Sequence, residues 1–316
     1  MPEIKKILII RLSSLGDIIL SFPLLKKLKE KFPGSEIHFF TKKDYGELLL
    51  LNPLVDKLIL FDDSLKMSRK QLGYENYDMI LDLHKNFRSI LVSIFNGKTI
   101  HRYKKEDFKK FLLVKFKINL FKEIIPVYKK YMQTIKEHLH SDDYNFVTSQ
   151  LNFDKVRFIL DDYIIISPSS KHFTKTYPAD EFIKYINSNK EKKFVLIGDR
   201  SRNDEEICKY IELKCDSVLN LCGKLSLSKL ANVIYYSRFV ICNDSAVLHF
   251  AEALGKKVTA IFGSTIKEFG FFPQLTQSEV LEVNNLQCRP CTHFGRESCP
   301  EGHFKCMKEI ELTVSS

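Results

Sequence analysis

The amino-acid sequence predicts an α/β protein with two domains, each built on a doubly wound parallel sheet. The chain has 316 residues, about twice the length of a typical single domain. Short apolar runs alternate with helical stretches along most of that length, which is the pattern of repeated βαβ units. A polar passage interrupts this alternation once, and the pattern then starts again. We therefore place the domains at residues 1–155 and 156–316.

The strands of the first half are predicted by five apolar or β-branched runs. In chain order they are KILIIRL, EIHFFT, KLILF, DMILDL and TIHRY. We expect a helix after the first run up to Phe32, a helical turn over Gly46–Leu51, and helices after the third and fourth runs. A basic helical stretch over Glu106–His140 follows. The polar passage SDDYNFVTSQLNFDKVRF then places the domain boundary near residues 145–160.

The second half repeats the pattern with the runs YIIISP, KFVLIG, SVLNLCG, FVICN and KVTAIFG. We expect helices from Ala179, around Asp204–Cys215, from Ser226 and from Ser245. A cysteine-rich tail over residues 286–308 follows the last run. This order predicts a second doubly wound sheet.

The composition excludes several classes of protein. Hydrophobic residues make up 44% and charged residues 28% of the chain, which is ordinary for a folded globular protein and excludes general disorder. The longest apolar runs, such as Ile7–Ile10, are far shorter than the roughly 20 residues that cross a bilayer. The basic and then apolar start ends at Arg11 with no small-residue cleavage site, so we expect a strand there and a cytoplasmic protein.

The net charge of +10 is concentrated in one stretch. Lys98–Tyr131 contains most of it and interleaves lysines with Phe, Tyr and Leu, a mixture that suits an anionic membrane surface, a phosphorylated glycolipid or nucleic acid. A solvated helix face is the alternative. Lys115 falls on the same helical side as Phe108, Phe111 and Leu112. This poor periodicity argues against a membrane anchor.

Polar residues follow several predicted strands of the second half. Asp244 and Ser245 begin a helix directly after FVICN, where a parallel sheet binds ligands and free helix N–H groups bind anions. An ordinary helix cap is the alternative. In SPSSKHFTKTYP, the hydroxyls of Ser167–Ser170 and the cation of Lys175 suit a pyrophosphate, although a lysine in a polar loop can equally lie on the surface. Acids in LIGDRSRNDEE are placed to hold a ribose hydroxyl.

The motifs that would indicate other enzymes are absent from the sequence. No G-x-G-x-x-G follows a strand, and no G-x-x-x-x-G-K-[ST] or G-x-S-x-G is present. These absences argue against a dinucleotide oxidoreductase, a P-loop nucleotidase and an esterase-type nucleophile elbow.

Five blocks in register over residues 4–265 resemble glycosyltransferase family nine, the bacterial ADP-heptose:lipopolysaccharide heptosyltransferases. The blocks are ILIIRLSSLGDIILSFPLLKKLKEKFP, LDLHKNFRS, SPSSKHFTKTYP, GKLSLSKLANVIYYSRFVICNDSAVLHFAEALG and FGST. The resemblance implies a GT-B fold, with two Rossmann-like domains facing a central cleft. It also implies an acceptor on the first domain, a nucleotide sugar on the second, and inversion at the anomeric carbon without a stably bound metal.

The resemblance assigns roles to individual positions. The catalytic base falls on Asp17 and the phosphate-binding lysine on Lys175, while Arg88 matches a basic position on the acceptor side. The remaining positions are expected to line the cleft or hold the donor: Ser13, Ser14, Ser170, Glu205, Leu225, Asp244, Ser245, Ala246 and His249. Family members usually have glycine at the position of Ala246, and its methyl group narrows the approach of the donor to the backbone.

The turn Ser13-Ser14-Leu15-Gly16-Asp17 would place the carboxylate where the first strand ends. Gly16 permits a sharp turn, and Pro23 would cost roughly 3 kcal/mol inside a continuous helix, so Asp17–Phe22 is expected to be a separate turn or a kink. A carboxylate near a helix N-terminus is a weak base. We therefore expect the bond to the diphosphate to break early, before Asp17 accepts the proton. The alternative is that Asp17 serves only as a helix cap.

Four of the eight cysteines lie together in the tail, at Cys288, Cys291, Cys299 and Cys306. Their density suits a structural zinc site, although the C-x6-C spacing of the second pair is not that of a zinc knuckle. Reduced structural thiols are the alternative, and a reducing cytoplasm disfavours disulfides.

The sequence thus predicts an inverting heptosyltransferase that needs no cofactor and transfers heptose from ADP-heptose to the lipopolysaccharide inner core. We expect a monomer in peripheral contact with the anionic inner membrane at its cytoplasmic face, with no nucleic-acid partner. One alternative is a family-nine enzyme with another nucleotide sugar. The other is a non-catalytic protein that binds anionic lipid or nucleic acid through Lys98–Tyr131, in which Asp17 and Lys175 would be dispensable.

Overall fold

The computed structural model describes residues 3–94, 96–157 and 161–314. Its contacts divide the chain into two compact units. The first unit contains residues 1–105 and 127–152, and the second contains residues 106–126 and 153–316. The main division thus falls at 152/153, while the excursion 106–126 groups with the second half of the chain.

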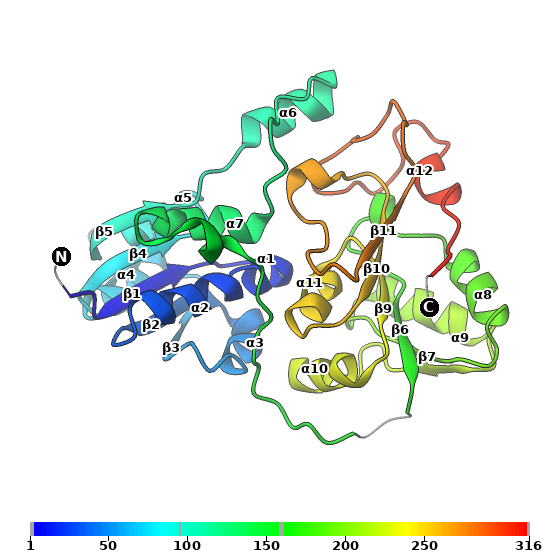
Figure 1. The fold of residues 1–316 in the computed structure, drawn as a ribbon, viewed down its shortest axis with the longest axis horizontal. Helices are drawn as coiled ribbons and strands as arrows, with labels where there is room; N and C mark the ends of the chain where they lie inside the picture. Colours follow the sequence, from blue (N-terminus) through cyan, green and yellow to red (C-terminus); the bar gives the residue numbers. More distant parts are fainter. Residues whose placement is uncertain (1–2, 95, 158–160, 315–316) are drawn as a thin grey trace. The chain divides into compact units, whose positions relative to one another are not determined.

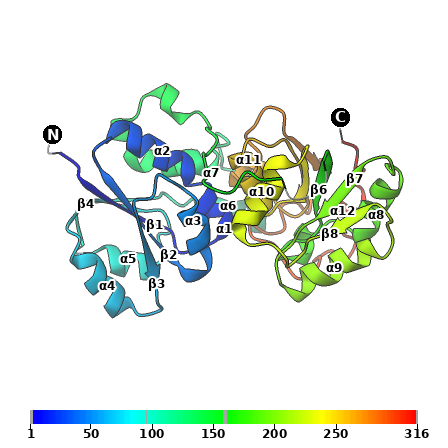
Figure 2. The ribbon, with the colours of Figure 1, turned by 90° about the horizontal axis from the view of Figure 1, so that it is seen from below.

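The first unit is built on a five-stranded parallel sheet in the order β3-β2-β1-β4-β5. The strands are β1 (Lys6–Ile10), β2 (Glu36–Lys42), β3 (Lys57–Phe61), β4 (Tyr77–Asp82) and β5 (Gly97–Arg102). Its helices are α1 (Leu15–Ile19), α2 (Phe22–Lys31), α3 (Gly46–Leu50), α4 (Leu65–Gly73), α5 (Phe87–Ser93) and α7 (Val127–Met132). In Figure 2, α2 and α7 lie over one face of this sheet, and α4 and α5 cover the other.

The second unit is built on a six-stranded parallel sheet in the order β11-β10-β9-β6-β7-β8. Its strands are β6 (Tyr163–Ser167), β7 (Lys193–Leu196), β8 (Val218–Asn220), β9 (Val240–Asn243), β10 (Val258–Phe262) and β11 (Glu279–Glu282). Its helices are α6 (Asp107–Phe116), α8 (Ala179–Asn187), α9 (Arg202–Glu212), α10 (Leu227–Tyr236), α11 (Ala246–Ala253) and α12 (Lys305–Lys308). Figure 1 shows α10 and α11 on one face of this sheet and α8 and α9 on the other.

These sheets confirm the predicted fold class, and all ten predicted strands are present. Both sheets continue on either side of a central first strand, which is the doubly wound topology. The apolar run Ile7–Ile10 forms the buried middle of the first sheet. β11 was not predicted, because Glu279–Glu282 is a short edge strand with only two apolar residues between two glutamates.

Pro23 separates two helices at the start of the chain, as expected. α1 ends at Ile19, and Pro23 lies in the first turn of α2, where its missing N–H costs nothing. The predicted helical stretch Glu106–His140 is only partly helical. α6 ends where Lys117 adopts a left-handed conformation with φ of 59°, and no helix is formed from there until α7.

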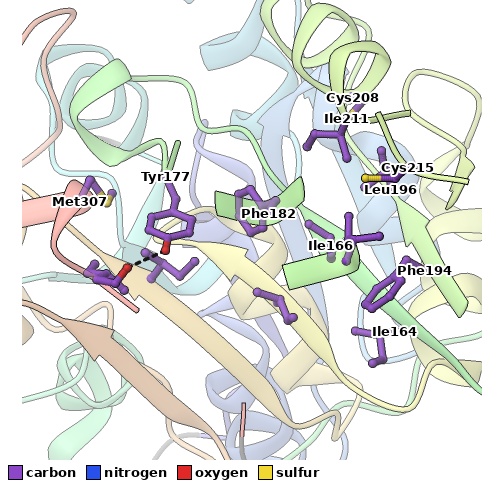
Figure 3. Packing of buried hydrophobic residues seen from close by; sticks show 14 of the residues in the cluster. Ile164, Ile166, Tyr177, Phe182, Phe194, Leu196, Cys208, Ile211, Cys215 and Met307 are labelled. Atoms are coloured by element: carbon purple, nitrogen blue, oxygen red, sulfur yellow. Dashed lines mark hydrogen bonds between the residues drawn. The ribbon is translucent and has the colours of Figure 1, made fainter. Parts of the chain in front are cut away.

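A buried hydrophobic cluster fills one side of the second sheet and anchors the C-terminal segment (Figure 3). Phe182 of α8 packs edge-on against Tyr177, with ring centroids 5.2 Å apart. The Tyr177 hydroxyl donates a hydrogen bond of 2.7 Å to the carbonyl of Ile310. The tail is therefore held by both apolar burial and a buried hydrogen bond.

Among the helices that the structure describes, none is long and apolar enough to cross a membrane.

Candidate active site

The candidate residues of the first unit gather where the sheet changes direction. β1 and β4 are neighbours from which the chain winds to opposite sides, and the crevice beyond such a pair is where doubly wound sheets bind ligands. Asp17 follows β1 and His84 follows β4. The Arg11 guanidinium joins the two strand ends, since Nη1 donates to the Leu83 carbonyl at 2.6 Å while Nη2 lies 2.7 Å from Oδ2 of Asp17.

Both carboxylate oxygens of Asp17 have partners. Besides Arg11, Oδ2 accepts hydrogen bonds from the Ser14 hydroxyl at 2.8 Å and the Ser14 backbone N–H at 3.3 Å. Oδ1 accepts a bond of 3.1 Å from the hydroxyl of Tyr131. The carboxylate is thus held from the residue that follows β1, from its own turn and from α7. It caps its own turn through Ser14, as the alternative interpretation expected, but the contacts with Arg11 and Tyr131 go beyond a cap.

Charge decides the protonation state of this buried carboxyl group. Burial pushes the pKa of Asp17 upward, but the charge of Arg11 and the hydrogen bonds from Ser14 outweigh it, so the pKa lies below its ordinary value. Burial raises the pKa of Tyr131 well above its usual range. Asp17 is therefore a carboxylate at neutral pH and Tyr131 is a neutral hydrogen-bond donor to it.

His84 adds a neutral side chain beside this cluster. Burial, followed by the charges of Arg11 and Lys105, lowers the pKa of His84 to about 4. Its imidazole is uncharged at neutral pH and can both donate and accept a hydrogen bond. Arg88, expected on the acceptor side, is exposed on α5 with its guanidinium 5.9 Å from the centre of the Phe61 ring.

The candidate residues of the second unit also gather at a change of direction, between β6 and β9. Lys175, in the connection after β6, lies 2.7 Å from Oδ2 of Asp244, directly after β9. The Thr265 hydroxyl donates to the same carboxylate oxygen at 2.6 Å. Both ionic side chains are largely buried, at 16% and 7% exposure. The structure thus brings together two residues that are 69 positions apart in the sequence.

Asn243 fixes the chain around this ion pair. Its Oδ1 accepts from the Tyr177 backbone N–H at 3.0 Å, and its Nδ2 donates to the Pro168 and Ser169 carbonyls at 2.9 and 3.3 Å. The connection that carries Lys175 is therefore tied at both ends to the last residue of β9. Ser170 is buried in the same connection.

The N-terminus of α11 opens beside the ion pair. Ser245 is the N-cap residue and Ala246 the first helical residue. The hydroxyls of Ser245 and Ser264 are both buried and make no hydrogen bond in the described structure. Two unsatisfied hydroxyls, a lysine and free helix N–H groups are donors that a diphosphate can use. His249, one turn further along, is buried and faces the Phe271 ring at 6.0 Å.

The two remaining donor candidates follow β7 and β8. Glu205 is exposed on α9, and its carboxylate lies beside Gly223, where an added Cβ would come within 3.0 Å of Oε1. Gly223 has φ of 69°, which favours glycine. Leu225, two residues later, is half-buried. Glu205 and the loop that holds Leu225 therefore lie together at the end of the sheet that carries Lys175.

The tail thiols are not grouped as a metal site in the part of the chain that the structure describes. All eight cysteines are free thiols, and among the described residues no three His, Cys, Asp or Glu side chains are grouped to hold a metal ion. Cys288 Sγ lies 4.0 Å from Nε2 of His303, and among the described residues no third such side chain joins this pair in a metal-binding group. Burial raises the pKa of Cys306 to about 11, which suits a structural thiol.

Comparison with known proteins agrees with this architecture. The model of glycosyltransferase family 9 (heptosyltransferase) matches residues 66–302. The chain is 26% identical over 308 residues to lipooligosaccharide heptosyltransferase 2 of Campylobacter jejuni, covering 94% of this chain and 92% of that relative. It is 29% identical over 290 residues to lipopolysaccharide heptosyltransferase 1 of Campylobacter coli, covering 82% of this chain and 84% of that relative.

Solved structures show the same fold. ADP-heptose lipopolysaccharide heptosyltransferase II of Escherichia coli superposes with a TM-score of 0.72 at 20% identity, over 97% of this chain and 98% of that chain. The E. coli heptosyltransferase WaaC with ADP superposes with a TM-score of 0.70 at 16% identity, over 87% of this chain and 92% of that chain.

Two Rossmann-like units in one chain, matched along nearly their whole length by these structures, define the GT-B fold. Since the family model covers well over half of the sequence, the chain belongs to glycosyltransferase family 9. The predicted family, fold class and enzyme class are confirmed. The roles of the individual site residues stay predictions.

Proposed function

We propose that this protein transfers heptose from ADP-heptose to a hydroxyl of the lipopolysaccharide inner core, with inversion at the anomeric carbon. The relatives that match most of the chain are named for heptose transfer to lipopolysaccharide or lipooligosaccharide. The observation that carries the proposal is the Lys175–Asp244 pair beside the open N-terminus of α11. It supplies the charge and the donors that a nucleoside diphosphate requires.

The second unit binds the donor in this proposal. Lys175 leaves Asp244 for a diphosphate oxygen or shares its charge between the two, while the Ser245 and Ser264 hydroxyls and the first N–H groups of α11 donate hydrogen bonds. Glu205 accepts from a ribose hydroxyl and Leu225 packs against the adenine. The contacts of Lys175, the hydroxyls and the helix N–H groups with the diphosphate become stronger as negative charge develops on the leaving ADP.

The first unit supplies the base. An acceptor hydroxyl oxygen attacks the anomeric carbon, the bond from that carbon to the diphosphate oxygen breaks, and the hydroxyl proton passes to the Asp17 carboxylate. Asp17 is a weak base because Arg11 and Ser14 stabilise its charge. The proton therefore moves late, once the departing diphosphate has made the attacking hydroxyl acidic.

The acceptor is a membrane lipid in this proposal, so the enzyme works at the membrane surface, and Arg88 contacts acidic groups of that lipid. We propose no cofactor for the transfer. The predicted monomer is checked by light scattering of the purified protein.

The test is acceptor-dependent release of ADP from ADP-heptose with truncated lipopolysaccharide, for the wild type beside Asp17→Asn. Asparagine has nearly the shape of aspartate, and its Oδ1 can still accept a hydrogen bond, but it cannot take the proton. We expect release by the wild type and a loss of at least 100-fold in the variant. Near-normal turnover by Asp17→Asn would exclude Asp17 as the base. Release only with another nucleotide sugar would replace the donor and leave the mechanism intact.

A further inference from the structure

The excursion over residues 106–126 carries an unusual concentration of exposed hydrophobic side chains. Sixteen large hydrophobic residues are exposed in the described chain, and six of them lie within residues 108–124. Phe108 is 70% exposed, Phe116 55% and Phe111 51%. The other three are Ile118, Leu120 and Ile124. Such clusters on a protein surface mark interaction sites, whereas scattered single residues do not.

The same excursion carries positive charge among these side chains. Between Phe108 and Ile124 the sequence has five lysines and one acid, at positions 109, 110, 115, 117, 122 and 123. Lys115 and Lys122 are exposed. Exposed aromatic rings interleaved with lysines match a surface that has both apolar chains and negative headgroups.

The excursion is fixed at its middle and leaves its aromatic residues uncovered. The Lys117 ammonium group donates to the carbonyls of Cys288 and Pro290 at 2.9 and 2.7 Å, and Asn119 contacts Glu268. Within the second unit, Figure 1 shows α6 standing away from the strands of the sheet. Lys117 therefore anchors the excursion to the cysteine-rich tail, while Phe108 and Phe111 on α6 are not used in the core.

We propose that residues 107–124 dock this protein on an anionic phospholipid bilayer by inserting the Phe108, Phe111 and Phe116 rings at the interface. Lys115 shares a helical side with Phe108 and Phe111 within α6, which argues against a wholly apolar anchor but suits docking at the interface, where a lysine head group reaches the lipid phosphates. The inference deepens the proposed function by naming the surface that holds the enzyme at its lipid acceptor. The docking inference rests on the proposed function only for which membrane the protein docks on.

The absence of tryptophan from the chain allows insertion to be observed directly. Phe116→Trp places one indole in the excursion, and Leu213→Trp places one at a residue that is 73% exposed at the end of α9. Each variant is mixed with vesicles of phosphatidylglycerol and phosphatidylcholine, or of phosphatidylcholine alone. We expect a blue shift, and quenching by brominated lipid, for position 116 with the anionic vesicles only.

Cosedimentation with the same vesicles distinguishes the contribution of ring insertion to binding from that of the lysine charges. Phe108→Ser/Phe116→Ser should weaken binding at least tenfold, while the matched control Val156→Ser/Leu213→Ser should bind as the wild type does. Lys115→Gln/Lys122→Gln should weaken binding and reduce its salt dependence, in contrast to Lys190→Gln/Lys193→Gln on the exposed surface of the second unit.

Three results would overturn this assignment. They are wild-type protein that does not bind the anionic vesicles, an indole at position 116 that stays in water while the protein is bound, and equal losses in the excursion and control variants. Heptose transfer to a delipidated, water-soluble core acceptor should be unchanged in Phe108→Ser/Phe116→Ser, and its loss would mean that the excursion serves the reaction itself. Transfer that is absent from the wild type as well would contradict the proposed function and leave the vesicle result standing.

Discussion

Replacing Arg11 by methionine removes the cation that lies 2.7 Å from the Asp17 carboxylate. The two side chains are only 10% and 15% exposed, so water cannot take over the lost interaction. Removing one partner of a buried ion pair costs about 3–5 kcal/mol, because the other charge stays buried. Ser14 and Tyr131 continue to bond Asp17, which favours the lower end, about 3 kcal/mol. At ~2–4 °C per kcal/mol, the melting temperature of the first unit should fall by roughly 6–12 °C.

The pH dependence of this loss follows from the sign of the pKa shifts. In the wild type the pKa of Asp17 is depressed, so the carboxylate stabilises the fold at neutral pH and loses this effect only as the pH falls below the ordinary aspartate range. Without Arg11, its charge no longer opposes the effect of burial, so the pKa of Asp17 moves upward. Protonation then relieves the buried charge, so the destabilisation should shrink on going from pH 7.5 to pH 5.

The assay is thermal unfolding of the wild type, Arg11→Met and Arg11→Lys at both pH values, with the pH–rate profile of ADP release. Arg11→Lys keeps the charge and should lose less stability. The acid limb of the rate profile should move to higher pH in Arg11→Met. If Arg11→Met melted within 2 °C of the wild type (about 1 kcal/mol) at pH 7.5, the reasoning that Arg11 neutralises a buried charge would be refuted.

Four further outcomes follow from the described contacts. Lys175→Gln should lower kcat for ADP release by about 10²–10³, whereas Lys190→Gln should leave it unchanged; a smaller loss would remove Lys175 from the leaving-group side. Burial raises the pKa of Glu252 to about 7, so stability should decline as the pH rises from 4.5 to 7, and thermal melts of Glu252→Gln should lack that slope. Tyr177→Phe should cost about 1–2 kcal/mol in urea unfolding, because the Ile310 carbonyl loses its buried donor. Iodoacetamide at pH 8 should alkylate buried Cys306, whose pKa is about 11, later than the partly exposed Cys288, as followed by mass spectrometry; equal rates would contradict the structural role of that thiol.

The sequence predicted what is local and missed what is brought together by folding. The strands and the turn at Pro23 were predictable because apolar runs and proline act through neighbouring residues. Asp17, Lys175 and Asp244 were candidates because each follows a strand. Tyr131, which bonds Asp17 across 114 positions, left no local signal.

Other site residues could have been found from signals in the sequence. Arg11 directly follows the buried run Ile7–Ile10, and a charged residue at the end of such a run requires a partner. Asn243 ends a buried strand in the same way, and its amide was treated only as part of an apolar run. Lys117 could not be found, because nothing in a lysine-rich stretch indicates a left-handed helix end.

The chain passes between the two units three times, at 105/106, 126/127 and 152/153. A protease that cut once near residue 152 would therefore not divide the chain into its two units, since residues 106–126 of the second unit would stay covalently attached to the first. A chimera that exchanged only residues 153–316 would separate Lys117 from the carbonyls of Cys288 and Pro290. Exchange of donor specificity between relatives thus requires residues 106–126 and 153–316 to be moved together. The shorter segment carries the surface that we propose to dock on the membrane.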